Sequence, residues 1–367
     1  MELVTEWIAV SNGALLLEHA SQVGDRPVSL ALLPISHSEP IAIADSVSEL
    51  WLSLTHTPVD DSRLSPEERS LIREFAAAGI ASPDLDHLQR VNRVEHSWFE
   101  SFQHELVCSL VTSIARGLGI RCLIIKGPTL HAQGLRRRVH SGDVDLLVDP
   151  RRIVEFVSAM NEWGWDKRPH PLDGTPAPHS HTLLPIGWGC EIDVHVRYPG
   201  ITIPSSTAFD LLWQHSEERF FAGVGGRTPT KAAHALIQGL TIVRPVPGRG
   251  RPRTGANPNA VEVLRAGGEQ TLSLAIELGS HGALADELKV AFPGTGIPKK
   301  KIPAEFVWLS QANHALLYLR MLQTVPLRDK PLLFWKVISH RRSLAEGGRE
   351  TLIQRWRRGF AESRRNP

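Results

Sequence analysis

The sequence predicts an α+β protein in three parts: a module of short strands and two helices, a mixed α/β domain, and a helical domain. Three observations support this prediction. Short apolar runs separated by turn residues fill residues 1–45, strand and helix patterns alternate between 92 and 196, and helical periodicity dominates from Phe209 onward. With about 100 to 200 residues expected per domain, we place the domain limits at 1–88, 89–225 and 226–367.

The composition is typical of a folded cytoplasmic protein. Hydrophobic residues make up 42% of the 367 residues and charged residues 22%, and no uncharged apolar run is long enough to span a membrane. Lys and Arg total 41 against 39 for Asp and Glu, so the net charge of +2 argues against nucleic acid as a partner. Three cysteines without a CxxC pair, and a start without a signal-peptide pattern, favour the reducing cytoplasm.

Residues 1–88 predict a winged-helix-like module. Strand and turn signals come first, a helix that the Asp45-Ser46 pair can cap comes next, and Ser65-Pro66 begins a second helix. This order resembles the PqqD-like domains that hold leader peptides of ribosomally made natural products. The resemblance implies that the module recognises a peptide. A winged helix that only packs on its neighbour, or one that once bound DNA, is the alternative.

The other two parts are predicted from apolar periodicity. In the α/β domain we expect a long helix over 92–117, a strand over 122–125, a helix after the turn at 126–128, a strand over 144–148, a helix from 149 to 164 and a hairpin over 182–196. In the last part we expect helices over 209–213, 232–243, 260–278, 306–322 and 332–338. The Pro, Gly and Arg content of 244–259 predicts a flexible loop, and the basic run 355–367 a solvated end.

Three aspartates carry the candidate chemistry. Asp143 and Asp145 are two apart in a predicted strand, so their side chains point to the same face. Asp193 lies in a second strand, where it shares a face with His195 and Glu191. Carboxylates held close together raise one another's pKa unless a cation neutralises them, and oxygen ligands suit Mg²⁺. A metal site is therefore predicted, although solvated carboxylates at a strand edge are the alternative.

Upstream, the Lys126-Gly127 turn precedes a helix start. Backbone N–H groups at such a turn favour a phosphate, and the Lys126 ammonium adds positive charge. A triphosphate together with two Mg²⁺ ions would support attack by an acceptor hydroxyl on the α-phosphate. A surface lysine that merely follows a strand is the alternative for Lys126.

These motifs resemble the DNA polymerase β-type nucleotidyltransferase superfamily, which combines a glycine turn, a DxD strand and a third Asp strand. More narrowly, they resemble the uncharacterised nucleotidyltransferases of the NTP_transf_5 type, over roughly residues 95 to 290. The matching segments here are Ile124-Ile125-Lys126-Gly127, Gly142-Asp143-Val144-Asp145-Leu146-Leu147-Val148 and Asp193-Val194-His195. The resemblance implies a nucleotidyltransferase-fold mixed sheet and an NTP substrate such as ATP.

By this resemblance, Asp143, Asp145 and Asp193 are the metal ligands and catalytic residues, with Asp193 as general base. The expected nucleotide contacts are Lys126, Gly127, Arg138 and His195. Two of these assignments have open alternatives. The arginine loop is one residue longer before Gly142 than in the family, so Arg136 or Arg137 can replace Arg138. His195 either contacts phosphate or acceptor, or is only hydrogen-bonded. The chain also has Lys-Gly where many members have Gly-Ser.

The acceptor is open. A PqqD-like module would imply a precursor peptide from natural-product biosynthesis, whereas a small-molecule alcohol, as in antibiotic-modifying relatives, fits the same catalytic residues. The alternatives are a toxin-like tRNA nucleotidyltransferase and a catalytically inactive peptide-binding protein. His170, His179 and His181 suggest zinc, but without a third ligand at fixed spacing we interpret them as part of a loop near the acceptor.

Overall fold

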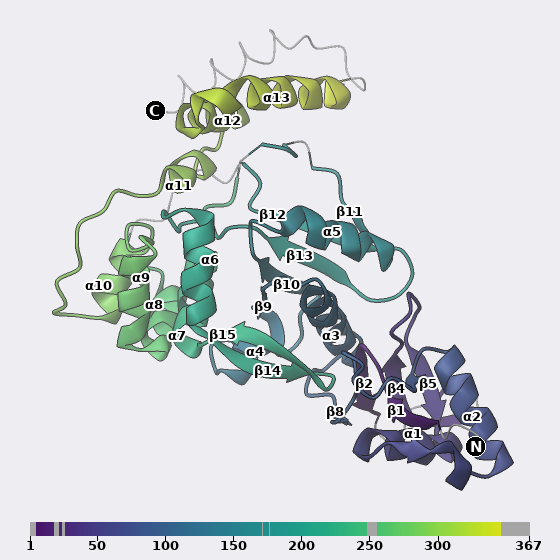
Figure 1. The fold of residues 1–367 in the computed structure, drawn as a ribbon. Helices are drawn as coiled ribbons and strands as arrows, with labels where there is room; N and C mark the ends of the chain where they lie inside the picture. The colour runs from purple at the N-terminus through teal and green to yellow at the C-terminus, as the bar shows by residue number, and fades with distance from the viewer. Residues whose placement is uncertain are drawn as a thin grey trace.

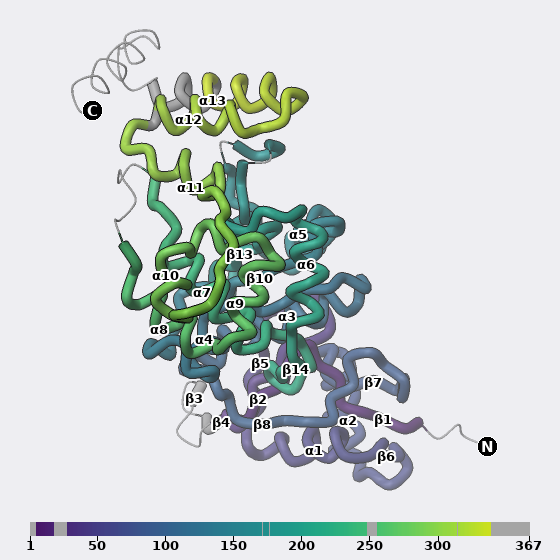
Figure 2. The backbone as a smooth tube through the Cα atoms, turned by 90° about the vertical axis from the view of Figure 1, so that its left-hand side faces the viewer, coloured from purple at the N-terminus to yellow at the C-terminus, as the bar shows by residue number. Residues whose placement is uncertain are grey.

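The computed structural model describes residues 5–17, 22–23, 26–170, 172–175, 177–247 and 255–345. They form an α+β protein with several sheets, and helices cover both faces of the central one, which confirms the predicted class. The N-terminal module and the last two helices lie at opposite ends of the molecule, with the central sheet between them (Figure 1, Figure 2). The basic run 355–367 lies outside the described residues.

The N-terminal module has the predicted order of strands followed by two helices. Its elements are β1 (Glu6–Ala9), β2 (Gly13–Leu16), β3 (Gln22–Val23), β4 (Arg26–Leu33), β5 (Ile41–Ala44), α1 (Asp45–His56), β6 (Val59–Asp60), α2 (Pro66–Ala77), β7 (Ala81–Ser82) and β8 (Glu95–His96). One sheet has the order β6-β1-β7, and the other has the order β3-β4-β2-β8 with β5 paired to β4. The helices bury Trp51, Leu54, Ile72 and Phe75 against these sheets.

Helix α2 begins as predicted, whereas α1 begins differently. The Ser65 hydroxyl accepts the Glu68 N–H and the Glu68 carboxylate accepts the Ser65 N–H, which is a capping box. Helix α1 starts at Asp45 itself, after Ala44, whose side chain makes no capping bond. The Asp45 carboxylate still lies in the first turn, where its negative charge interacts favourably with the positive end of the helix dipole. The winged-helix class and the peptide ligand of this module remain predictions.

The long helix predicted over 92–117 is shorter, because α3 spans Phe102–Gly117. Its first turn carries Glu105, whose buried carboxylate accepts hydrogen bonds from the Ser97 hydroxyl at 2.7 Å and the Trp98 N–H at 3.1 Å. The same carboxylate accepts the Ala222 N–H at 2.8 Å. These bonds fold the preceding segment back onto the helix start, so the apolar residues before 102 pack without extending the helix.

The central sheet has the strand order β11-β12-β13-β10-β9. Its strands are β9 (Cys122–Ile125), β10 (Asp143–Val148), β11 (Trp165–Lys167), β12 (Ser180–Pro185) and β13 (Glu191–His195). Strands β10 and β13 are parallel, and the other neighbouring pairs are antiparallel. The predicted strands and hairpin are present, whereas the sequence pattern missed β11, which has only three residues.

The two faces of this sheet pack against different helices. Alternate residues of β10 and β13, such as Val144 and Ile192, share a core with α3 and α5 (Ile153–Glu162). On the other face, Leu147 shares a core with helices of the C-terminal part. Because side chains alternate along a strand, the aspartates of β10 and β13 lie on the same face as Leu147. Helices α6 (Ser205–Gln214) and α7 (Lys231–Val243) lie on that side of the sheet (Figure 1).

The C-terminal part is mainly helical. Its elements are α6 (Ser205–Gln214), β14 (Ser216–Phe221), β15 (Val224–Pro229), α7 (Lys231–Val243), α8 (Pro258–Gly267), α9 (Glu269–Glu277), α10 (Ala285–Ala291), α11 (Ala304–Leu309), α12 (His314–Thr324) and α13 (Lys330–Ala345). None of the helices in the described part of the chain combines the length and apolar character that crossing a bilayer demands. Residues 248–254 of the predicted loop lie outside the description.

Two helices predicted as continuous are broken. The segment 260–278 divides into α8 and α9 at Gly268, whose φ of 78° is in the left-handed region that ends helices. The segment 306–322 divides into α11 and α12, and the Asn313 side chain caps the second by accepting the Ala315 N–H.

The β14–β15 hairpin and α10 were not predicted. The hairpin packs beside the central sheet, and the Thr228 hydroxyl donates a hydrogen bond of 2.8 Å to the Ile124 carbonyl in β9. Residue 225, the expected domain limit, lies inside β15. The domain limits themselves remain a prediction.

Candidate active site

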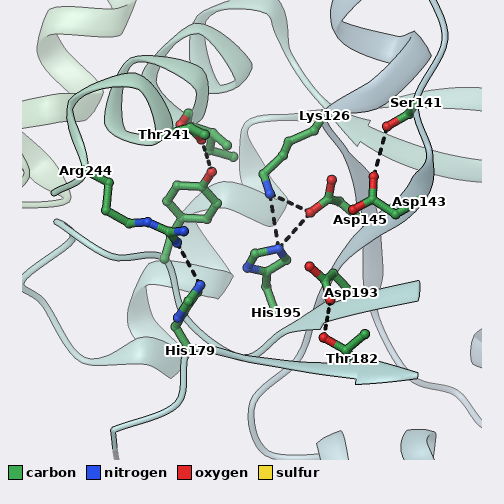
Figure 3. Close-up of polar contacts among 12 residues, drawn as sticks. Lys126, Ser141, Asp143, Asp145, His179, Thr182, Asp193, His195, Thr241 and Arg244 are labelled. Atoms are coloured by element: carbon green, nitrogen blue, oxygen red, sulfur yellow. Dashed lines mark hydrogen bonds and ion pairs between the residues drawn. The ribbon is translucent and has the colours of Figure 1, made fainter. Parts of the chain in front are cut away.

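The three predicted aspartates lie on the two parallel strands of the central sheet. Asp145 in β10 is the direct register partner of Asp193 in β13. Asp143 lies two residues before Asp145 and therefore on the same face. The close-up shows the three carboxylates side by side (Figure 3). The fold thus brings together the residues that the DxD and DxH patterns singled out.

Asp145 is the most buried of the three and has two nitrogen partners. Its Oδ1 atom lies 2.9 Å from His195 Nε2 and 2.5 Å from Lys126 Nζ, and these two nitrogens are 3.3 Å apart (Figure 3). Burial alone would raise the pKa of Asp145, but the His195 hydrogen bond and the Lys126 charge outweigh burial and lower the pKa. Asp145 is therefore a carboxylate at neutral pH.

Hydroxyl groups orient the other two aspartates. Thr182 in β12 donates a hydrogen bond of 2.6 Å to Asp193, and Ser141 donates one of 3.1 Å to Asp143. Burial, followed by the neighbouring Asp145 charge, raises the pKa of Asp143 despite its bond to Ser141. This repulsion between adjacent carboxylates is what a bound cation relieves.

One donor atom each from Asp145, Asp193 and His195 lies within 4.8 Å of the others, a spacing that one metal ion can bridge. Carboxylate oxygens are preferred ligands of Mg²⁺. The site therefore fits a divalent cation, and Asp143 lies beside it. The zinc interpretation of His170, His179 and His181 gains no support, because within the described residues these three do not form such a group.

The Lys126-Gly127 turn adjoins the carboxylates. Both residues have positive φ angles, 59° and 54°, and α4 (Gly127–Ala132) begins there. The Lys126 N–H donates to His234 Nε2 at 2.8 Å, and the Lys126 carbonyl accepts the Thr129 hydroxyl. The Lys126 N–H is therefore committed to His234, and the contact of the turn with a phosphate stays a prediction. The ammonium remains as its charged group.

The environment of Lys126 keeps its side chain charged. Burial would lower the pKa of the ammonium, but the Tyr198 oxygen and the Asp145 carboxylate outweigh burial and raise the pKa. The ammonium also lies 5.9 Å from the centroid of the Tyr198 ring. The alternative of a surface lysine does not describe this side chain, which is only 19% exposed.

Two arginines of the arginine loop differ in their exposure to solvent. Arg138, the expected nucleotide contact, is exposed. Arg136 is partly buried and donates a hydrogen bond of 2.6 Å to the His140 carbonyl. Burial, followed by Arg138, lowers the pKa of Arg136, while Asp143 and Asp145 act in the opposite direction. Arg136 therefore lies close enough to Asp143 and Asp145 for their charges to act on it.

Two residues near this site, Tyr198 and His234, were not singled out from the sequence, whereas His179 and Arg244 were placed only in loops. His195 stacks on Tyr198, with ring centroids 5.6 Å apart, and lies 5.7 Å from the His179 ring. Arg244 donates a hydrogen bond of 2.8 Å to His179 Nε2 (Figure 3). His234 left a sequence signal, as a lone histidine in the apolar run of α7. Tyr198 reaches the site through tertiary packing alone.

Comparisons with known proteins do not assign the chain to a family. No family model matches the sequence, and no curated protein matches it. Among solved structures, the antibiotic-resistance factor ANT(2'')-Ia is similar over 49% of this chain and 90% of its own length, with 15% identity and a TM-score of 0.30. A likeness at that level leaves the function to be argued from the site itself.

Proposed function

We propose that this protein is a divalent-cation-dependent nucleotidyltransferase that moves a nucleoside monophosphate from an NTP to a hydroxyl group. The observation that carries the proposal is the register pairing of Asp145 with Asp193 on parallel strands, with Asp143 on the same face. Three converging carboxylates beside a lysine suit the metal and triphosphate that this reaction requires.

Asp143, Asp145 and Asp193 would hold the cation, whose chemistry suits Mg²⁺. Bound there, it supplies positive charge that stabilises the leaving pyrophosphate and acidifies the attacking hydroxyl. Asp193, oriented by Thr182, takes the hydroxyl proton while the hydroxyl oxygen bonds to the α-phosphorus. The bond from the α-phosphorus to the bridging oxygen breaks, and pyrophosphate leaves.

The remaining site residues would bind and orient the nucleotide. Lys126, Gly127 and a loop arginine, Arg138 or Arg136, contact the triphosphate. His195 holds the Asp145 carboxylate in place through its hydrogen bond and keeps water from it through its burial. The pairs of Arg244 with His179 and of His195 with Tyr198 line the side of the site toward α7.

The acceptor belongs to the same proposal and is a hydroxyl of a peptide or a small molecule. A peptide would use the N-terminal module as its recognition site, as the resemblance to PqqD-like domains implies. The two classes are separable in the full-length protein, because exposed substitutions confined to the N-terminal module would reduce modification of a peptide and spare that of a small alcohol.

The experiment that tests the activity uses each labelled NTP with Mg²⁺ and candidate acceptors, and measures pyrophosphate release and label transfer. Asp145→Asn should abolish both. Asp166→Asn is the matched control, because Asp166 is an exposed aspartate in β11 that bonds to Asn161 away from the site. Equal rates for the wild type and Asp145→Asn would refute the proposed activity.

A further inference from the structure

The Lys126 ammonium is bonded to Asp145, one of the three carboxylates that would hold the cation. Its Nζ atom is 2.5 Å from Asp145 Oδ1 and 3.3 Å from His195 Nε2. Asp145 and His195, together with Asp193, are the residues whose donor atoms lie within 4.8 Å of one another. Lys126 is thus a positive charge already bound to a ligand of the candidate metal site.

The backbone of Lys126 is held by hydrogen bonds on both sides, whereas its side chain is an intrinsically flexible stem. The N–H is bonded to His234 and the carbonyl to Thr129, so the turn is held from both sides. The ammonium, by contrast, is attached through a flexible four-carbon chain. It can therefore leave Asp145 without any change in the turn.

A divalent ion and this ammonium would repel each other at Asp145. Two cations close to the same carboxylate oxygen repel each other, and the repulsion is large where burial lowers the effective dielectric constant. The Asp145 side chain is 7% exposed, so solvent screens the pair poorly. Coordination of the ion therefore favours displacement of the ammonium, which stays tethered beside Gly127.

We propose that Lys126 is an exchangeable counter-ion: its ammonium and the divalent cation compete for Asp145, and cation binding releases the ammonium to the triphosphate. The inference rests on the proposed function for the identity of the anion. It assigns Lys126 a positioning role that couples the two ligands, because whatever releases the ammonium strengthens its contact with the nucleotide. A lysine that only neutralises Asp145 would provide no such coupling.

The test is a titration of the full-length protein with Mn²⁺ alone, in which free Mn²⁺ is measured by electron paramagnetic resonance. Removal of the competing charge in Lys126→Met should tighten Mn²⁺ binding about tenfold or more, whereas Lys126→Arg should stay near the wild type. Lys167→Met is the matched control, because Lys167 pairs with Asp173 and not with the three aspartates. Unchanged or weaker Mn²⁺ binding by Lys126→Met would overturn the proposal.

A second measurement follows the wild-type lysine itself and does not depend on a variant that folds. Acylation of Lys126 by a small reagent, quantified by mass spectrometry, should rise several-fold when Mn²⁺ is added, while that of Lys167 stays constant. Labelling of Lys126 that is indifferent to Mn²⁺, or that falls, contradicts release. In Asp145→Asn, labelling should be high with or without Mn²⁺.

The outcome of these two tests is distinguishable from the outcome of the activity assay. Competition between Mn²⁺ and Lys126 without turnover of any NTP would leave the counter-ion inference standing and remove the proposed transferase. Turnover of an NTP without competition between Mn²⁺ and Lys126 would support the proposed transferase and remove the counter-ion inference.

Discussion

Asp145 and Asp193 are register partners on adjacent parallel strands, and each has a hydrogen-bond partner that holds it. His195 lies two residues after Asp193 in the same strand, yet it bonds to Asp145 across the ladder. The hydrogen bonds that hold the two carboxylates therefore connect both strands, and we expect loss of one of these bonds to disturb the whole site. This relationship gives the first prediction.

Thr182→Val should lower kcat/KM for nucleotidyl transfer by about tenfold to a hundredfold, the usual effect of losing an outer-shell partner of a metal ligand. The valine keeps the shape of the side chain but cannot donate to Asp193. Steady-state kinetics and Mn²⁺ affinity would both show the loss. Thr112→Val in α3, which removes a buried hydroxyl bond to the Cys108 carbonyl, should leave kcat/KM unchanged, and a similar loss in both variants would contradict a local role for Thr182.

Gly127→Ala should lower the free energy of unfolding by about 1 to 2 kcal/mol, because alanine is strained at a φ of 54°. Gly134→Ala is its match, since Gly134 has a φ of 72° and open space around it. Chemical denaturation should show similar losses for the two variants. Only Gly127→Ala should also reduce activity. Equal activity in both variants would show that the turn does not contact the nucleotide.

His234→Gln should reduce the pH dependence of stability. Burial lowers the pKa of His234 to about 3, whereas an unfolded histidine has a pKa of about 6.5. Between these values the unfolded state binds the extra proton, so stability falls as the pH falls through this window, by about 1.4 kcal/mol per pH unit for this residue.

Glutamine cannot take up that proton, yet its oxygen can still accept the Lys126 N–H. Urea unfolding at several pH values between 6 and 4 should therefore show that the free energy of unfolding depends less steeply on pH in the His234→Gln variant than in the wild type. An unchanged slope would show that His234 is not the neutral buried group inferred here.

Asp149→Asn should destabilise the fold by about 2 kcal/mol at pH 7. Asp149 is buried at the end of β10 and pairs with Arg121 at 2.9 Å and Arg151 at 2.7 Å. Burial opposes its charge, but the arginine bonds lower the pKa of Asp149 to about 2. Since the folded pKa lies below the unfolded value of about 3.9, this stabilisation is complete above pH 4 and is lost toward pH 2.

The difference between wild type and Asp149→Asn in thermal melts should therefore shrink over that range. Asp166→Asn, on the exposed surface, should show little change at any pH. A difference that persists undiminished at pH 2 would assign the effect to packing rather than to charge.

The sequence predicted the strands around the site well and the helices beyond it less well. Strand β9 matches the predicted run, and the face shared by Asp143 and Asp145 follows from the period of two along a strand. The start of α3 was misplaced because the bonds to Glu105 come from Ala222, far away in the chain, as well as from nearby residues. Periodicity registers only neighbours in sequence, so it cannot detect such partners.

By itself, the sequence determined which residue types share a strand face and where the glycine turn lies, because both depend on local backbone geometry. Only the tertiary structure decided that Asp193 pairs with Asp145, that the Lys126 ammonium reaches that carboxylate, and that Tyr198, His179 and Arg244 line the same site. Those contacts depend on strand order and on how α7 packs against the sheet. Both are set by the burial of apolar side chains distributed over the whole chain, which no local pattern encodes.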